Sequence, residues 1–189
     1  MPTFAGLNAA QTTIVTKDIA NARQLAMRAV NSMTLSAIAT PGGSRDYSYG
    51  IRPATARLLY EAFCISETQP DPDQVDKVKN VFVSFDGRMQ GTAFTFVPGR
   101  AKPGVIEFEA FTDRTKPNTI FLRVEYFAKP DADRPLTLLH EYVHLVFSNN
   151  PGNGHPGGQQ IAFGRTVMGI PFADASRNPY CYEYYAHYI

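Results

Sequence analysis

Apolar and polar positions follow a helical spacing over three stretches in the first half of the chain. From about Thr12 to Leu35, small and apolar residues recur every three or four positions with charged residues between them. This spacing predicts one long amphipathic helix. A Thr-Pro-Gly-Gly-Ser sequence at 40–44 breaks the pattern. A second helix is predicted to begin at Pro53 and a third at Asp73.

Beyond Gly87 the pattern changes to short runs rich in β-branched and aromatic residues, separated by turns that contain proline and glycine. These runs predict strands at Met89 to Val97, Val105 to Phe111 and Thr119 to Val124. Helical spacing returns at about Pro135 to Phe147, and, after a loop from Asn149 to Gly158, near Gln159 to Met168 and Pro179 to Tyr188. The predicted fold class is α+β, mainly helical with a small β-sheet.

Length and composition narrow the classes of protein that fit. The 189 residues suit a single domain spanning 1–189. Eighteen basic and seventeen acidic residues without a run of like charge argue against nucleic acid or a membrane surface as a partner. The first thirty residues hold no uninterrupted apolar segment, so neither a signal peptide nor a transmembrane helix is predicted there. Two cysteines are too few for a disulfide framework, although one bridge between Cys64 and Cys181 stays open.

The segment Leu138 to Val146 contains the motif HExxH. Its histidines, His140 and His144, are one helical turn apart, so both imidazoles can bind one ion. Glu141 lies beside that face, where a carboxylate can take a proton from a metal-bound water. A separate apolar stripe, made of Leu136, Leu139, Val143 and Val146, would anchor the helix in the core. The motif predicts a metallopeptidase site with Zn²⁺ as cofactor and Glu141 as general base.

Catalytic zinc usually has three protein ligands, so a third is expected. His155 follows His144 by eleven residues in a glycine-rich loop that can fold back over the metal. Glu183 is the main alternative, and His187 ranks after it. The spacing from His144 to His155 is too long for the HExxHxxGxxH arrangement of metzincins. On this basis the zinc-binding part spans about 131–189, and a helical and sheet part spans about 1–130.

Several segments resemble the deuterolysin and peptidyl-Lys metalloendopeptidase family, the aspzincins. Gln11 to Ala29 is similar to the family's long first helix, Asp46 to Gly50 to its aromatic-Gly turn before the second helix, and Thr119 to Leu122 to the strand before its zinc helix. Nearer the C-terminus, HEYVH fits the family's HExxH, and Asn178 to Ala186 is similar to its NADNYEYFA segment. The resemblance implies a zincin-like fold in which His140 and His144 bind zinc and Glu141 is the catalytic base.

The chain departs from the family pattern at three positions. The family's third ligand is the aspartate of a GTxDxxYG motif, and His155 stands at the corresponding place, which implies a divergent member with three histidine ligands. The tyrosine of that motif, which assists the transition state, falls on Gly158, so one of the tyrosines in 180–185 is a candidate for its role. In lysine-specific members an aspartate and a glutamate contact the substrate. Glu183 matches the glutamate, whereas Tyr180 replaces the aspartate.

These observations predict a zinc-dependent endopeptidase that hydrolyses a protein or peptide substrate, with Glu183 and Tyr180 in substrate binding. Glu183 cannot be both the third ligand and a substrate contact. The lack of a signal peptide leaves the localisation unknown and suits a secreted effector or toxin domain, with a secretion apparatus or an immunity protein as partner. The alternative is a catalytically inactive peptidase-like binding module, which the departures at His155 and Gly158 keep open.

Overall fold

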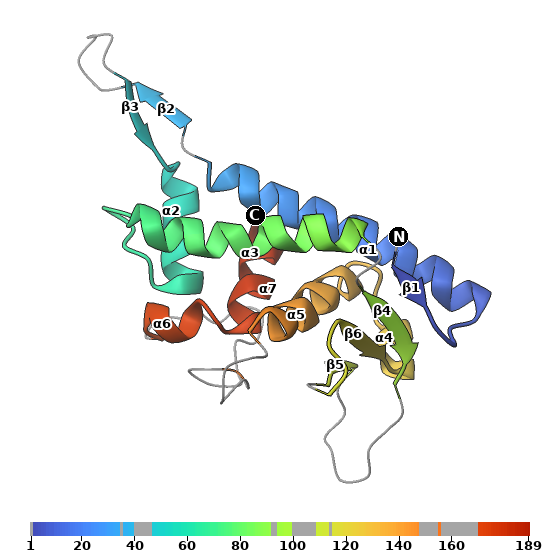
Figure 1. Ribbon diagram of the computed structural model, residues 1–189. Helices are drawn as coiled ribbons and strands as arrows, with labels where there is room; N and C mark the ends of the chain where they lie inside the picture. The colour runs from blue at the N-terminus through green and yellow to red at the C-terminus, as the bar shows by residue number, and fades with distance from the viewer. Residues whose placement is uncertain are drawn as a thin grey trace.

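Two long helices, α1 (Ala9–Ser32) and α3 (Pro72–Gln90), lie side by side in the computed structural model (Figure 1). The structure describes residues 2–34, 36–39, 47–91, 94–99, 109–113, 115–147, 155 and 170–189. The helix α2 (Pro53–Phe63) packs against the C-terminal helix α7 (Pro179–Tyr188), and the short helix α6 (Phe172–Ala175) lies near α2. A small sheet lies at the other end of the molecule (Figure 1).

The first helix confirms the predicted amphipathic pattern and begins three residues earlier than expected. Asn8 accepts a hydrogen bond from the backbone N–H of Gln11, whose side chain accepts one from the Asn8 backbone in return. This capping box satisfies backbone donors that the first helical turn would otherwise leave unpaired. Ala22, Ala26 and Ala29 are fully buried along one face. Their small side chains let α3 and α5 (Arg134–Val146) pack closely against α1.

The prediction of a strand starting at Met89 is wrong. Met89 is 1% exposed and belongs to α3, which continues to Gln90. The buried residues of α3 keep their spacing of three or four through Phe82, Phe85 and Met89. Gly87 lies on the exposed side of this helix, where a Cβ would contact no other atom.

The four-stranded sheet has the order β1-β4-β6-β5, with bounds β1 (Thr3–Phe4), β4 (Thr95–Pro98), β5 (Ala110–Thr112) and β6 (Thr119–Leu122). The pairs β1/β4 and β4/β6 are parallel, whereas β5 runs antiparallel to β6. The predicted last strand is confirmed but ends at Leu122. Val124 is 75% exposed and begins α4 (Val124–Ala128). In the described part of the chain, β5 is therefore an edge strand of this sheet.

Five elements were not predicted: β1, α4, α6 and the two strands of an antiparallel hairpin, β2 (Ser36–Ala39) and β3 (Tyr47–Gly50). Figure 1 shows this hairpin projecting away from the helices. Residues 47–50 therefore form a strand, where the resemblance implied a turn. Residues 105–108 of the second predicted strand, the predicted helix 159–168 and most of the loop 149–158 lie outside the described residues.

A buried ion pair joins α1 to the start of α5. The Nε of Arg134 donates to Oδ2 of Asp18 at 2.8 Å, and both side chains are almost fully buried. Tyr126 donates its hydroxyl to the same oxygen at 2.8 Å. Arg134 also donates to the backbone oxygen of Lys129 at 2.8 Å and to Asp131 at 2.7 Å. These contacts fix the beginning of α5 against the first helix.

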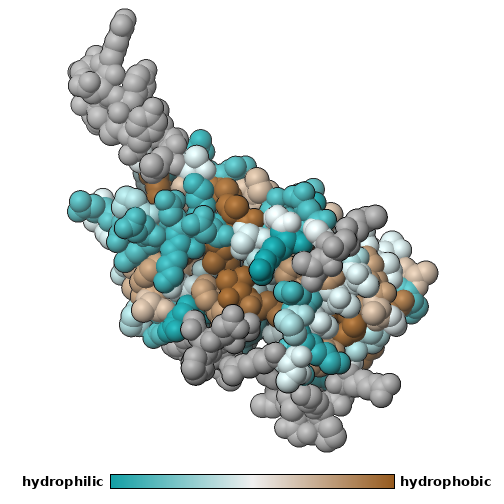
Figure 2. Space-filling model, viewed as in Figure 1, coloured by the Kyte–Doolittle hydropathy of each residue, from teal (hydrophilic) through white to brown (hydrophobic). Residues whose placement is uncertain are grey.

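The mostly helical α+β class predicted from the sequence is confirmed. In the described part of the chain, no helix is long and apolar enough to cross a membrane. Figure 2 shows apolar residues gathered near the middle of one face between hydrophilic margins. Cys64 and Cys181 are both free thiols, so the disulfide that the sequence left open is not formed.

Candidate metal centre

Helix α5 carries the HExxH motif through the middle of the molecule. It packs against α1 on one side, against α7 on another and against β5. Of the predicted apolar stripe, Leu136, Leu139 and Val143 are buried and anchor the helix, whereas Val146 is only partly buried. His140 and Glu141 are also almost fully buried, with 9% and 6% exposure. The motif therefore lies in a site shielded from bulk solvent.

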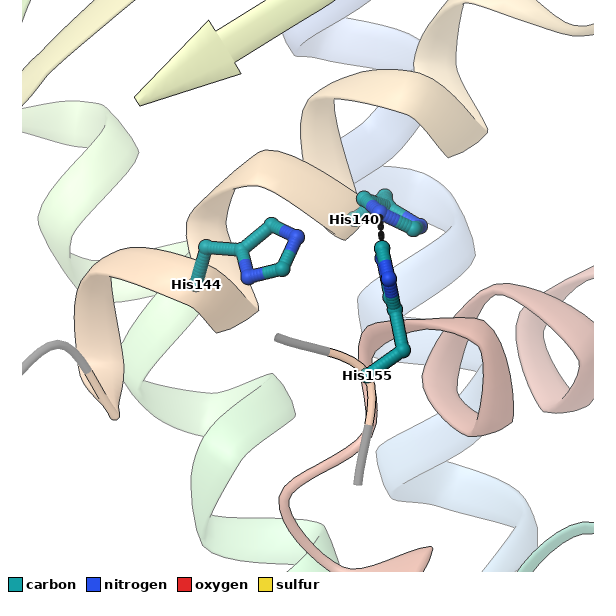
Figure 3. Close-up of side chains that lie close together, drawn as sticks. All are labelled: His140, His144 and His155. Carbon is teal, nitrogen blue, oxygen red and sulfur yellow. Dashed lines mark hydrogen bonds between the residues drawn. The ribbon is translucent and has the colours of Figure 1, made fainter. Parts of the chain in front are cut away.

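Three imidazoles converge on one space beside α5. One ring nitrogen from each of His140, His144 and His155 lies within 4.8 Å of the other two. Figure 3 shows His140 and His144 extending from the helix and His155 rising from a separate segment to meet His140. The loop histidine is thus brought to the motif across fifteen residues of sequence.

One pair of these nitrogens has the spacing expected of two ligands on a tetrahedral metal ion. The two Nε2 atoms of His140 and His155 are 3.2 Å apart. Metal–nitrogen bonds of about 2.0–2.1 Å in tetrahedral geometry place two ligand nitrogens about 3.3–3.4 Å apart. Imidazole nitrogens are ligands that suit zinc and other transition metals. The three histidines therefore form a candidate metal site with room for one further ligand.

Glu183 determines which ring nitrogen of His140 carries the proton. Its Oε2 lies 3.0 Å from Nδ1 of His140. Because a carboxylate only accepts hydrogen bonds, Nδ1 of His140 carries a proton and donates a hydrogen bond to Glu183. Nε2 is then unprotonated, and its lone pair points toward the other histidines. A carboxylate behind a histidine ligand fixes its tautomer and raises its basicity. Sequence reasoning placed Glu183 on the metal or on the substrate and did not include this orienting role.

Burial keeps the other two histidines neutral. Desolvation and the neighbouring His140 lower the pKa of His144 to about 3 and that of His155 to about 4. Neutral imidazoles have the lone pair that a metal ligand needs. At neutral pH, therefore, no proton has to be removed from either ring before a metal binds.

Glu141 lines a cavity of about 290 Å³ next to His140. Burial, together with the charges of Glu183 and Glu109, raises its pKa to about 7, although His140 opposes this shift. A carboxyl group with a pKa in this range can both accept and return a proton near neutral pH. Its place in the cavity agrees with the role of base that the motif predicts.

The far wall of the cavity carries a polar group of residues that the sequence did not reveal. Lys129 forms an ion pair with Glu109 and donates a hydrogen bond to Oγ1 of Thr137 at 3.0 Å. All three residues line the same cavity as Glu141. They come from the approach to β5, the end of α4 and the first turns of α5. No local motif links them, because only the fold brings these segments together.

Tyr180, in the first turn of α7, also lines the cavity. Its ring centroid lies 4.6 Å from that of His140 and 4.5 Å from that of His155. Burial and the nearby carboxylates of Glu183 and Glu141 raise its pKa, so the phenol keeps its proton. Tyr180 and Glu183 are three residues apart and therefore share one face of the helix.

His187, the third-ranked candidate ligand, is not in this group. It is exposed near the end of α7, with its ring 4.6 Å from that of Tyr188. Among the described residues, the group that could hold a metal consists of His140, His144 and His155. Their role as ligands remains a prediction.

Comparison with solved structures shows the fold of a zinc peptidase. The chain is similar to a zinc peptidase from Grifola frondosa, with a TM-score of 0.62 over 96% of each chain. The two sequences are 14% identical, so the likeness concerns the fold alone. No protein-family model matches the sequence, and a search of curated proteins finds no match either.

Proposed function

We propose that this protein is a zinc-dependent endopeptidase in which His140, His144 and His155 bind the metal and Glu141 is the general base. One observation carries the proposal: three imidazole nitrogens grouped within 4.8 Å of one another, beside a buried glutamate that lines a cavity. The fold shared with a zinc peptidase supports it. A structural zinc site would ordinarily be closed by cysteines, and both cysteines lie outside this group.

The residues around the site suit hydrolysis of an amide bond. Zinc, when bound, supplies a Lewis acid that polarises a carbonyl and makes a water molecule more acidic. Glu141 takes a proton from the attacking water onto its carboxylate and later delivers it to the leaving amine nitrogen. Glu183 holds His140 in one tautomer throughout. His140 and Glu141 are almost fully buried, which strengthens the electrostatic interactions of these two side chains.

An extended peptide can reach this site along β5. This strand is the last in the order β1-β4-β6-β5, and it packs against the helix that carries the motif. Ala110, its first residue, lines the cavity with Glu141. Backbone groups at a sheet edge can pair with an added strand, which gives affinity for the main chain of a substrate. A side chain of the bound peptide would then enter the cavity.

The test combines zinc content with cleavage of denatured casein, an unstructured substrate. We expect the wild-type protein to bind one zinc ion and cleave casein. Glu141→Gln should keep the metal and lose cleavage, because the amide cannot act as a base. His155→Ala should lose both. His187→Ala is the matched control, since it removes the remaining histidine of the chain, which lies outside the site.

The same measurements separate the two functions that the sequence predicts. Cleavage that disappears in Glu141→Gln supports the peptidase. A wild-type protein that holds zinc and cleaves neither casein nor a library of peptides would favour the catalytically inactive binding module. Wild-type protein without affinity for zinc would refute the zinc peptidase. The role of secreted effector, with a secretion apparatus or immunity protein as partner, stays a prediction from the sequence.

A further inference from the structure

Amide hydrolysis by the proposed mechanism needs a hydrogen-bond donor for the carbonyl oxygen, which becomes negatively charged in the transition state. Three of the residues that line the cavity, Glu109, Glu141 and Glu183, are carboxylates, which accept hydrogen bonds when ionised. Three donors line it beside them: Tyr180, Lys129 and Thr137. The question is which of these donors can serve the reacting carbonyl.

Two of the three donors are already engaged at the far wall. Lys129 donates to both Glu109 and Thr137, so its ammonium group is held between two acceptors. The hydroxyl of Thr137 accepts from Lys129 and lies 3.4 Å from the backbone oxygen of Asp133. Tyr180 differs from both, since among the described residues its hydroxyl has no hydrogen-bond partner.

Tyr182, Tyr184 and Tyr185 of the same helix cannot take this role. Each donates or shares its hydroxyl elsewhere: Tyr182 with the backbone oxygen of Ser176 at 2.8 Å, Tyr184 with Glu61 at 3.3 Å, and Tyr185 with Ser32 at 2.9 Å. The rings of Tyr182 and Tyr185 are also fully buried in the core, against Phe63 and Phe82. Of the four candidates that the sequence offers, Tyr180 alone lines the cavity.

The position of Tyr180 relative to the histidines matches the requirement. Its ring is at least as close to those of His140 and His155, at 4.6 and 4.5 Å, as the ring of His144 is, at 5.0 Å from each. A phenol with an ordinary pKa of about 10 is a neutral donor at neutral pH. The ring of Tyr180 therefore lies beside the histidines and lines the same cavity as Glu141.

We propose that Tyr180 is a catalytic residue that donates a hydrogen bond to the oxyanion of the tetrahedral intermediate. This inference rests on the proposed peptidase function. When water attacks the carbonyl carbon, a C–O bond forms, the carbonyl π electrons move to oxygen, and the water proton passes to Glu141. Tyr180 stabilises that oxygen and keeps its own proton. On collapse the C=O bond re-forms, the C–N bond breaks, and Glu141 returns its proton to the amine.

The decisive variant is Tyr180→Phe, which removes the hydroxyl and keeps the ring against both histidines. Loss of one oxyanion donor lowers kcat about 10²- to 10³-fold in other hydrolases. We expect a fall in kcat of that order, with little change in KM and an unchanged zinc content. Tyr188→Phe is the matched control, because its ring is on the same helix, 48% exposed and outside the cavity. That variant should cleave like the wild type.

A binding measurement gives a second readout that does not depend on turnover. A phosphinic peptide built on the casein sequence that the wild type cleaves carries a tetrahedral, anionic group in place of the carbonyl. Calorimetry should show that Tyr180→Phe weakens its binding at least tenfold, while the product peptides bind equally well to both proteins. A donor that acts only in the transition state predicts this difference.

Three results would overturn the inference. The first is an active wild type with full kcat in Tyr180→Phe. The second is a loss confined to KM, which would make Tyr180 a substrate contact, the role that its position implies by family resemblance. The third is a normal Tyr180→Phe together with a large fall in kcat for Lys129→Met, which would assign the donor to Lys129. A zinc-loaded wild type without any cleavage would instead refute the proposed peptidase, and this inference with it.

Discussion

The contact between Glu183 and His140 predicts a specific loss of metal affinity when the carboxylate is removed. Oε2 lies 3.0 Å from Nδ1, and the Glu183 side chain is only 14% exposed, so water replaces this contact poorly. Removal of such a supporting carboxylate typically weakens metal binding about 10- to 100-fold. That factor corresponds to about 1.4–2.7 kcal/mol of binding free energy. We expect Glu183→Ala to fall in this range.

A graded series of variants tests the physical reason. Glu183→Gln keeps an oxygen that accepts from Nδ1 but loses the charge, so its zinc affinity should lie between those of the wild type and Glu183→Ala. Competition with a chromophoric chelator at neutral pH measures the dissociation constants. Glu67→Ala, which removes an exposed glutamate outside the site, is the control. Wild-type affinity in Glu183→Ala would refute the orienting role. A loss as large as that of His144→Ala would make Glu183 a metal ligand.

Three further predictions concern stability. Asp18→Ala leaves the buried guanidinium of Arg134 without its counterion. It should lower the free energy of unfolding, measured by urea denaturation, by about 3–5 kcal/mol. Lys17→Ala is the control: it removes the exposed ion pair with Asp131 and should lower the same free energy by less than about 1 kcal/mol. The pKa values of His144 and His155 are lowered in the folded, metal-free protein. As the pH falls from about 6.5 towards 4, these two histidines therefore take up protons only in the unfolded chain. The free energy of unfolding should decrease over this pH range. The raised pKa of Glu141 has the opposite effect, because the folded protein takes up this proton between pH about 7 and the ordinary pKa of a glutamate. Glu141→Gln should therefore make the loss of stability at low pH steeper. A stability that does not change with pH in either protein would contradict these pKa shifts. Chelation of zinc should lower the Tm of the wild type, because binding to the folded state alone stabilises it; an unchanged Tm would argue against a metal bound in the folded protein.

Helices with continuous periodic patterns could be predicted from the sequence. The apolar stripe of the HExxH segment placed α5 to within one residue at each end. The same reasoning fails at Met89, because the β-branched and aromatic residues at 92–97, just after α3, favour a strand. The spacing of Phe82, Phe85 and Met89 indicates instead that the helix continues past Gly87.

More of the candidate metal site than of the cavity beside it could be predicted from the sequence. His140, Glu141 and His144 are fixed relative to one another by the geometry of one helix turn, which sequence alone supplies. His155 was the preferred third ligand because of its glycine-rich loop, and the structure brings it to the other two histidines. The contact of Glu183 with His140 depends on how α7 docks against α5, and so does the place of Tyr180. This docking depends on packing between segments that are far apart in the sequence, so no local sequence pattern predicts it.

The orienting contacts of Arg134 mean that the zinc-binding part of the chain is incomplete without the first helix. Arg134 begins the motif helix and depends on Asp18 of α1 for its counterion, while it also holds the backbone of Lys129 at the cavity wall. A fragment starting near residue 131 would contain all three histidines and Glu141, yet it would expose the face of α5 that α1 covers and lose the acid that Arg134 needs. The segment with the HExxH motif is therefore not expected to fold independently of α1. Its transfer to another scaffold, or its expression as a shortened fragment, would have to bring the N-terminal helix along.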